Sequence, residues 1–353
     1  MKHRKNWCIG FLILTLSILG IIGGITAIVD PFFHFGPPKS FLQYPIDLPR
    51  YQNDGIVKHY TYDAIITGSS MSIGFKTTQC DELFDVTSIK VPFTGTSFAE
   101  ISHNLQRAIS ANPDIKLIIC SIDPWFLFTD SDYMRTDATF PEYLYDENPL
   151  NDVSYLFNKE VLLKVWDVLE YTKNGNVTTT FDEYLQYPQE PEHYGKEKVL
   201  SQYQRPAKAP SGLTFTQEDS QRLTKNLQDN VISLAQANPD IQFIYFFPPV
   251  SVVHWDEEMQ NGNVPRLVAA LEQTSEQLLQ WENIRVFSFL DDYETVTNLG
   301  LYFDTIHYAN SVSSLMLQRM QEGSFELTLN SCQPYWQEVG EFYTSYPYED
   351  IFR

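Results

Sequence analysis

The chain has 353 residues, of which 43% are hydrophobic and 20% are charged, a balance that excludes intrinsic disorder, coiled coil and collagen. Its formal net charge is −21 at pH 7. Before position 30 the charged residues are Lys2, Arg4 and Lys5, so the remaining 21 Lys and Arg face 45 Asp and Glu, a net charge of −24. A surface this acidic repels nucleic acid and anionic lipid headgroups, so we expect no nucleic-acid partner.

The N-terminus predicts a membrane anchor. Residues 1–6 carry the basic side chains, and residues 7–29 contain no charged side chain. About 20 apolar residues span a bilayer, and basic residues before the span favour a cytoplasmic N-terminus. The alternative is a cleaved signal peptide, whose apolar region would be roughly 7–15 residues and whose exit would be a small-x-small site, which Ala27-Ile28-Val29 fits poorly. We expect a single-pass protein of the cell membrane with a cytoplasmic tail at 1–6, a transmembrane signal anchor at 7–29 and an extracytoplasmic remainder.

The cysteines leave two readings open. Cys8 falls in the predicted span, whereas Cys80, Cys120 and Cys332 lie outside it. They allow at most one disulfide, or three separate free thiols. Their spacing is not that of a metal site, and the chain has no Gly-rich phosphate loop and no HExxH motif, so we expect no metal and no other cofactor.

Beyond the span, an extracytoplasmic neck at 30–60 is rich in proline and aromatic residues, and an aromatic C-terminal tail occupies 323–353. Between them, at 61–322, apolar runs alternate with amphipathic segments. This alternation predicts an α/β fold with a parallel sheet covered on both faces. Strands are expected at 62–67, 88–91, 117–122, 243–247 and 284–289, and helices after capping boxes that begin at Ser97 and Thr216, at roughly 258–282 and at about 309–322.

Residues 124–215 interrupt this alternation of apolar runs and amphipathic segments. They are rich in Tyr, Asp and Asn and contain one convincing helix, at 159–171. An insertion after the C-terminal end of a strand lies at the edge where open α/β sheets bind ligands, so it predicts a wall or lid of the site. A surface excursion without a function is the alternative.

Two short motifs carry candidate chemistry. Gly68-Ser69-Ser70 follows the first strand, and Asp304 and His307 lie three residues apart before the last helix. A nucleophilic serine needs a base, and that base needs an orienting acid. Ser70 is therefore the candidate nucleophile, His307 the base and Asp304 the acid, with Ser69 as nucleophile if the turn is displaced by one residue. The structural alternatives are helix N-caps at Ser70 and Asp304 and a polar helix start at His307.

Together these motifs resemble the first and last blocks of the SGNH (GDSL-type) hydrolase superfamily. Gly68-Ser69-Ser70-Met71 is similar to its G-D-S-L block, and Asp304 with His307 to its D-x-x-H block. The resemblance covers roughly residues 60–322. It implies a flavodoxin-like three-layer α/β/α sandwich that follows the single transmembrane helix.

Within that superfamily the chain is similar to membrane-anchored bacterial members. These resemble the D-alanyl transfer protein of teichoic acid modification and the acetylation proteins of exopolysaccharide export. The G-S-S form of the first block and the Pro-Trp-Phe run at 124–126 support this placement.

Two further positions come from the resemblance. The family's second block supplies an oxyanion glycine, and Gly95 is its candidate here. The third block is G-x-N-D, whose Asn side chain completes the oxyanion hole, whereas this chain has Asp123 at the matching place. An ionised aspartate has no proton to donate. Asp123 is therefore protonated, or turned away from the oxyanion, or has another task such as ending its strand.

The resemblance implies a membrane-anchored, extracytoplasmic serine esterase or O-acyltransferase acting on small acyl groups, such as acetyl, of a cell-surface glycan. The expected partners are an acylated glycan or cell-surface polysaccharide and the lipid bilayer, with a membrane acyltransferase as a further candidate. Aromatic residues, 14% of the chain, suit stacking on sugars, and the charge of −24 argues against a polyphosphate teichoic acid as the main ligand. The alternative is a non-catalytic glycan-binding or scaffold protein of a cell-envelope polymer-modification assembly.

Overall fold

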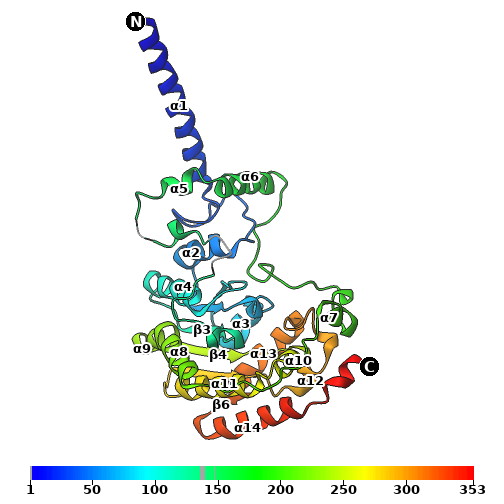
Figure 1. Cartoon of the computed structure of the whole chain (residues 1–353). Helices are drawn as coiled ribbons and strands as arrows, with labels where there is room; N and C mark the ends of the chain where they lie inside the picture. Colours follow the sequence, from blue (N-terminus) through cyan, green and yellow to red (C-terminus); the bar gives the residue numbers. More distant parts are fainter. Residues whose placement is uncertain (1, 136–139, 147) are drawn as a thin grey trace. The chain divides into compact units, whose positions relative to one another are not determined.

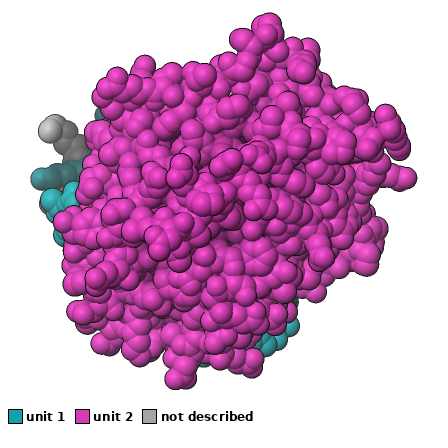
Figure 2. Space-filling model, turned by 90° about the horizontal axis from the view of Figure 1, so that it is seen from below, with its two compact units in different colours: residues 1–60, 138–180 teal, residues 61–137, 181–353 magenta. Residues whose placement is uncertain are grey.

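The computed structural model describes residues 2–135, 140–146 and 148–353. It consists of two compact units (Figures 1 and 2). We call residues 1–60 and 138–180 the anchor unit, and residues 61–137 and 181–353 the sheet unit. This division differs from the expected one, because the neck shares a unit with the middle of the predicted insertion, and the C-terminal tail belongs to the sheet unit.

The anchor unit begins with α1 (Lys2–Val29), a single uninterrupted helix. In the described part of the chain, α1 is the one helix long and apolar enough to cross a membrane. Near its C-terminal end Gly23, Thr26 and Val29 are buried. They recur every three residues and so share one side of the helix. Helices α5 (Val153–Leu156) and α6 (Lys159–Lys173) pack beside this end (Figure 1).

The neck, which is rich in proline and aromatic residues, contains a regular helix. Residues Pro49–His59 form helix α2, which starts with a proline whose missing N–H costs nothing at that position. Tyr51 of α2 packs on a small aromatic core that also contains Phe32, Tyr155 and Val161. The core joins the neck to residues far along the chain, which is why both belong to one unit.

The sheet unit contains a six-stranded sheet of order β2-β1-β3-β4-β5-β6. Five strands are parallel and the edge strand β6 is antiparallel, which confirms the α/β prediction but corrects the expectation of an entirely parallel sheet. In register, Ile118 of β3 pairs with Ile65 of β1 and Phe243 of β4. Every residue of β1 and β3 is buried, so both faces of these central strands are covered. The strands are β1 (Ala64–Thr67), β2 (Ser88–Lys90), β3 (Leu117–Ser121), β4 (Gln242–Phe247), β5 (Ile284–Ser288) and β6 (Glu326–Leu327).

The connecting helices begin at recognisable caps. The predicted capping box at Thr216 is present, with Asp219 as its second member. At Ser97 the hydroxyl accepts the Glu100 backbone N–H, and the Glu100 carboxylate accepts the Thr96 hydroxyl. The α-helices of this unit are α3 (Thr77–Phe84), α4 (Phe98–Ala111), α7 (Lys196–Gln202), α8 (Gln217–Leu227), α9 (Ser233–Ala237), α10 (Val252–Gln260), α11 (Val264–Leu278), α12 (Tyr293–Val296), α13 (Asn310–Glu322) and α14 (Leu329–Ser345).

One expectation about the C-terminal half was wrong. The single helix expected at 258–282 is two helices, α10 and α11, because Gly262 adopts a left-handed φ of +68° between them. Most of the aromatic C-terminal tail is α14, which packs along α11. Trp336 of α14 is fully buried there and donates a 3.1 Å hydrogen bond to the Ser275 hydroxyl.

Candidate active site

The turn after β1 requires a glycine. Gly68 has a φ of +127°, and a Cβ there would lie 2.4 Å from the hydroxyl oxygens of both Ser72 and Ser121. The turn leads directly into the 3-10 helix η1 (Ser70–Ser72). The Ser69 hydroxyl caps this helix by accepting the Met71 backbone N–H at 3.0 Å. The N-cap role considered for Ser70 therefore belongs to Ser69.

Ser70, His307 and Asp304 form one continuous hydrogen-bonded array. Ser70 Oγ lies 2.8 Å from His307 Nε2, and His307 Nδ1 lies 2.6 Å from Asp304 Oδ2. A serine nucleophile, its base and the acid that orients the base need this order and these distances. The structure thus brings together the three residues that the two sequence motifs singled out.

The loop that carries Asp304 and His307 is held by its own backbone. A bridge pairs Tyr302 with Tyr308, and the Phe303 N–H donates to the His307 carbonyl at 2.9 Å. Asp304 Oδ1 accepts the backbone N–H groups of Ile306 and His307, at 2.9 and 2.8 Å. One carboxylate oxygen of Asp304 thus organises the turn and the other contacts the His307 ring. The helix N-cap reading of Asp304 is wrong, because α13 begins at Asn310 with Ala309 as its N-cap.

The environment keeps Asp304 ionised. Burial by itself raises the pKa of Asp304, but the hydrogen bond from the His307 ring, the charge of that ring and the two backbone N–H groups outweigh it, so the pKa lies below its usual value. An ionised carboxylate accepts the proton on His307 Nδ1. His307 Nε2 is then left to receive a proton from Ser70.

Gly95 lies in the loop after β2 and in the wall of the same cavity as Ser70. It has a φ of +56°. Its carbonyl oxygen accepts a hydrogen bond from the Arg135 guanidinium at 3.1 Å, and a Cβ at this position would lie 2.0 Å from the same nitrogen. A glycine at 95 therefore suits both the backbone conformation and the approach of Arg135.

Asp123 is fully buried at the carboxyl end of β3. Neither of its carboxylate oxygens has a hydrogen-bond partner in the part of the chain that the structure describes. Burial raises the pKa of Asp123 to about 7, and the Ser69 and Ser121 hydroxyls, which lie nearby without meeting hydrogen-bond geometry, offset it only in part. Asp123 is not among the residues that line the cavity, so it lies behind the serine turn rather than in the cavity wall.

A cavity of about 490 Å³ opens over the array. Among the aromatic residues that line it, Tyr187 contacts two members of the array. Its hydroxyl donates to the Ser70 carbonyl at 2.9 Å, and its ring centroid lies 5.2 Å from that of His307. Burial and then the charge of Asp304 raise the pKa of Tyr187, so its hydroxyl stays protonated and donates. The lining residues are Ser69, Ser70, Ile73, Thr94, Gly95, Trp125, Tyr187, Phe303, Asp304, Ile306 and His307.

Sequence reasoning did not list Trp125, Tyr187 and Phe303 as site residues. Trp125 could have been found from its place directly after β3, and Phe303 from its place beside Asp304. Tyr187 lies in the predicted insertion with no motif around it. The insertion does supply a wall of the cavity through Trp125 and Tyr187, as expected.

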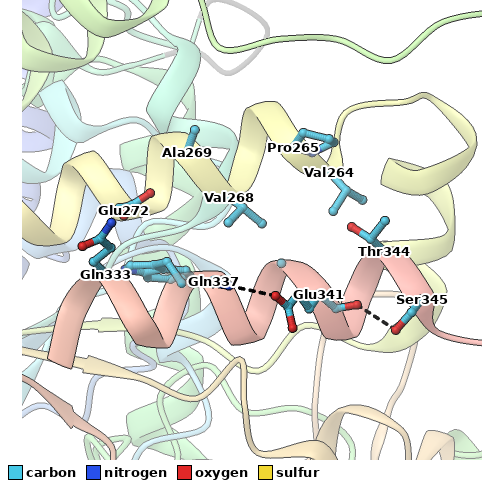
Figure 3. Close-up of a pocket in the computed structure, with 12 residues that line it drawn as sticks. Val264, Pro265, Val268, Ala269, Glu272, Gln333, Gln337, Glu341, Thr344 and Ser345 are labelled. Atoms are coloured by element: carbon cyan, nitrogen blue, oxygen red, sulfur yellow. Dashed lines mark hydrogen bonds between the residues drawn. The ribbon is translucent and has the colours of Figure 1, made fainter.

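A larger cavity, of about 830 Å³, lies apart from this site, between α11 and α14 (Figure 3). Val264 and Val268 line it from α11, and Gln337, Glu341 and Ser345 from α14. In Figure 3 the Gln337 amide donates to Glu341 at 3.0 Å, and the Ser345 hydroxyl donates to the Glu341 carbonyl at 2.7 Å. Gln337, Glu341 and Ser345 are thus hydrogen-bonded to one another along α14.

Among residues 2–135, 140–146 and 148–353 no group of three or more His, Cys, Asp or Glu is placed to hold a metal ion, and the four cysteines are unpaired. Comparison of the chain with protein-family models, with curated proteins and with solved structures finds no match.

Proposed function

We propose that this chain is a membrane-anchored, extracytoplasmic serine esterase or O-acyltransferase of the SGNH (GDSL-type) superfamily. The observation that carries the proposal is the hydrogen-bonded array of Ser70, His307 and Asp304. The parallel strand order β2-β1-β3-β4-β5 supports it, because that order is typical of a flavodoxin-like α/β/α sandwich. Ser70 follows the carboxyl end of β1, the edge at which such sheets bind ligands.

The proposed reaction begins with Ser70. Its Oγ attacks the acyl carbonyl carbon while its proton passes to His307 Nε2, and the former carbonyl oxygen becomes an oxyanion. The backbone N–H groups of Ser70 and Gly95 are the candidate oxyanion donors. Ser70 is the first residue of η1, so its N–H has no acceptor within that helix.

The bond between the acyl carbon and the leaving alcohol then breaks, and that alcohol takes the proton from His307. Water or an acceptor hydroxyl attacks the resulting acyl-Ser70 ester while His307 accepts its proton. Release of Ser70, which regains the proton, gives a carboxylic acid in hydrolysis or a new ester in transfer. Asp304 keeps the His307 ring oriented through both halves of this cycle.

The cavity supports a small acyl group on a sugar as the substrate class. Its volume of about 490 Å³ falls within the usual range of small-molecule sites. The aromatic side chains of Trp125, Tyr187 and Phe303 line the cavity, and aromatic side chains are common in pockets that bind sugars. We therefore propose acetylated or similarly acylated cell-surface glycan as the substrate, with a membrane acyltransferase as a candidate partner.

The apolar helix α1 supports a location in the cell membrane. It would cross the bilayer once, with residues 1–6 in the cytoplasm and the sheet unit outside. Substrates would then be polymers at the outer surface of that membrane.

Labelling with a fluorophosphonate, which phosphonylates an activated serine, tests the proposal. The full-length protein in detergent would be compared with Ser70→Ala and with the matched control Ser69→Ala. We expect the wild type and Ser69→Ala to be labelled and Ser70→Ala to be unlabelled, with parallel rates of p-nitrophenyl acetate hydrolysis. Undiminished labelling of Ser70→Ala would contradict the assignment of the nucleophile.

Asp123 favours a second candidate, a non-catalytic glycan-binding or scaffold protein of an envelope assembly. At the sequence position where the SGNH superfamily has an oxyanion donor, this chain has the buried Asp123. Loss of one such donor raises the activation barrier by about 2.7–4 kcal/mol. A folded wild type that resists the fluorophosphonate but binds an acetylated oligosaccharide, measured by calorimetry, would support this candidate instead.

A further inference from the structure

The anchor unit exposes large apolar side chains on α6. Trp166 is 67% exposed and Leu163 is 52% exposed, although large apolar residues are usually buried in a water-soluble surface helix. Other exposed apolar side chains surround them. Outside α1 the exposed large hydrophobic residues of the anchor unit include Phe35, Phe41, Leu150, Val153, Phe157, Leu163, Trp166, Leu169 and Val177.

The buried face of α6 is mostly apolar, formed by Val161, Lys164, Val165 and Val168, and its exposed face carries large apolar side chains as well. Its buried face includes Lys164, whose Nζ lies 2.6 Å from Asp47 Oδ1. At 100° per residue, an arc of about 120° centred on Trp166 contains Leu162, Leu163 and Leu169 together with Lys159, Glu170 and Lys173, and Asp167 lies about 40° beyond Leu163. Lysines at the two ends of an apolar face can keep their charges in water while their stems cover apolar surface. This composition is typical of a helix that lies in a membrane interface.

Phe157 places this surface beside the predicted span. Its Cζ would lie 3.3 Å from a Cβ on Gly23 of α1. Gly23 precedes Val29 by six residues, about 9 Å along the helix axis. The uncharged stretch 7–29 is about 34 Å long and the hydrocarbon core about 30 Å thick, so little of that stretch can project from the bilayer. The contact between Phe157 and Gly23 is thus about 5–9 Å inside the outer boundary of the hydrocarbon core, a depth that the apolar side chains of interfacial helices reach.

Asp30 ties α5 to the end of α1. Its buried carboxylate accepts the backbone N–H groups of His34, Phe35 and Gly36, at 2.9, 2.9 and 3.1 Å, and the hydroxyl of Tyr155 on α5 at 2.7 Å. These bonds connect the residue at the exit of α1 to the helix that precedes α6. The depth of α1 in a bilayer would therefore determine the depth of α5 and α6.

We infer that α5 and α6 lie in the outer interface of the membrane that α1 crosses, with Phe157, Leu163 and Trp166 inserted at the boundary of the acyl chains. The occupant of this apolar face is phospholipid, because the face continues the apolar surface of α1 and combines a tryptophan with flanking lysines, the residues preferred in the interfacial layer. The contact of α5 and α6 with the bilayer is a second attachment to the membrane besides α1. It limits tilting of the rest of the anchor unit relative to the membrane. This inference depends on the membrane anchor in the proposed function.

Environment-sensitive labels on α6 test the inference in the full-length chain. Cys8→Ser removes the exposed cysteine, and the other three cysteines are buried. In that background an NBD fluorophore is attached at Trp166→Cys, at Leu169→Cys or at the control Asp167→Cys, which lies about 100° round the helix from Trp166 and about 160° from Leu169. Each protein is reconstituted in phosphatidylcholine vesicles. We expect labels at 166 and 169 to emit at shorter wavelength, to be quenched by brominated lipid and to be several-fold less quenched by iodide than the label at 167.

Equal iodide quenching at 166 and 167, in protein that floats with the vesicles, would overturn the inference. Shielding from iodide in native membranes without quenching by brominated lipid in vesicles would also overturn it, in favour of a protein partner on this face. A chain that does not float with vesicles would refute both the anchor and the inference. Fluorophosphonate labelling of Ser70 tests the proposed catalytic function separately, so failure of the membrane inference and failure of the catalytic proposal can be distinguished.

Discussion

Ser69 and Ser70 are neighbours in the chain, but their hydroxyl groups have different partners. The Ser69 hydroxyl accepts the Met71 N–H and caps η1, whereas the Ser70 hydroxyl lies 2.8 Å from His307. Because Ser69 satisfies the cap, the Ser70 side chain is available to the base.

Alanine at these two positions should separate stability from catalysis. Ser69→Ala removes the cap, so we expect the free energy of unfolding to fall by about 0.5–2 kcal/mol while esterase activity persists. Ser70→Ala should leave stability nearly unchanged and lower kcat by a factor of about 10³ or more. Urea unfolding and p-nitrophenyl acetate hydrolysis measure the two effects, and the reverse pattern would exchange the roles of the two serines.

Asp304→Asn should impair the base without removing it. An amide cannot hold the proton on His307 Nδ1 as a carboxylate does, so we expect kcat to fall by about 10²–10⁴. The free energy of unfolding should change as well. Because the pKa of Asp304 is lower in the folded chain than its ordinary 3.8, the wild type gains stability above that value and loses it as the pH falls through the folded pKa.

Urea unfolding between pH 2.5 and pH 7 checks this second effect, since Asp304→Asn should lose less stability on acidification than the wild type. The exposed Asp167 offers the control Asp167→Asn, which should retain wild-type activity. Equal kcat for Asp304→Asn and wild type would remove Asp304 from the catalytic array.

Asp123→Asn should abolish a distinct pH dependence of stability. Since the pKa of Asp123 is about 7 when folded and 3.8 ordinarily, raising the pH from 4 to 7 ionises the unfolded chain first and destabilises the fold. The difference of about three pKa units corresponds to about 4 kcal/mol, lost progressively over that interval. Urea unfolding at pH 4.5 and pH 8 should show this loss in the wild type and a smaller one in Asp123→Asn.

The same variant tests the effect of the Asp123 charge on catalysis. We expect the wild-type kcat/KM to decline above about pH 7, because ionisation of the carboxylate buried behind the serine turn adds a negative charge that opposes the developing oxyanion. Asp123→Asn should lack this decline. Identical pH profiles for the two proteins would show that Asp123 does not influence the reaction.

Gly68→Ala should distort the serine turn. The new Cβ would lie 2.4 Å from two hydroxyl oxygens in addition to occupying a left-handed backbone conformation, so we expect a loss of about 3 kcal/mol or more and loss of fluorophosphonate labelling. Gly175→Ala is the matched control. Gly175 has a φ of +71° and nothing within 4 Å of its Cβ position, so only the backbone penalty, about 1 kcal/mol, should appear in thermal unfolding. Equal losses in both variants would mean that the turn accommodates the added methyl group.

Local patterns predicted the elements on which the site is built. The apolar span of α1, the buried strands and the helix that begins at Thr216 are recognisable because apolar periodicity and side-chain caps act over a few residues. Asp304 and His307 were found in the same way, because a pair three residues apart is a local pattern. The break at Gly262 was missed, since a glycine within a helical pattern does not by itself reveal a left-handed φ.

The order of residues alone therefore determined the membrane-spanning candidate, the α/β class and the three polar residues of the array. Tertiary structure decided which serine meets His307, since Ser70 and His307 are 237 positions apart and only the packing of the loops at one sheet edge brings them together. It also brought Tyr187 to the Ser70 carbonyl and buried Asp123 without a partner. Contacts between distant segments depend on how whole elements pack, and local sequence periodicity does not predict that packing.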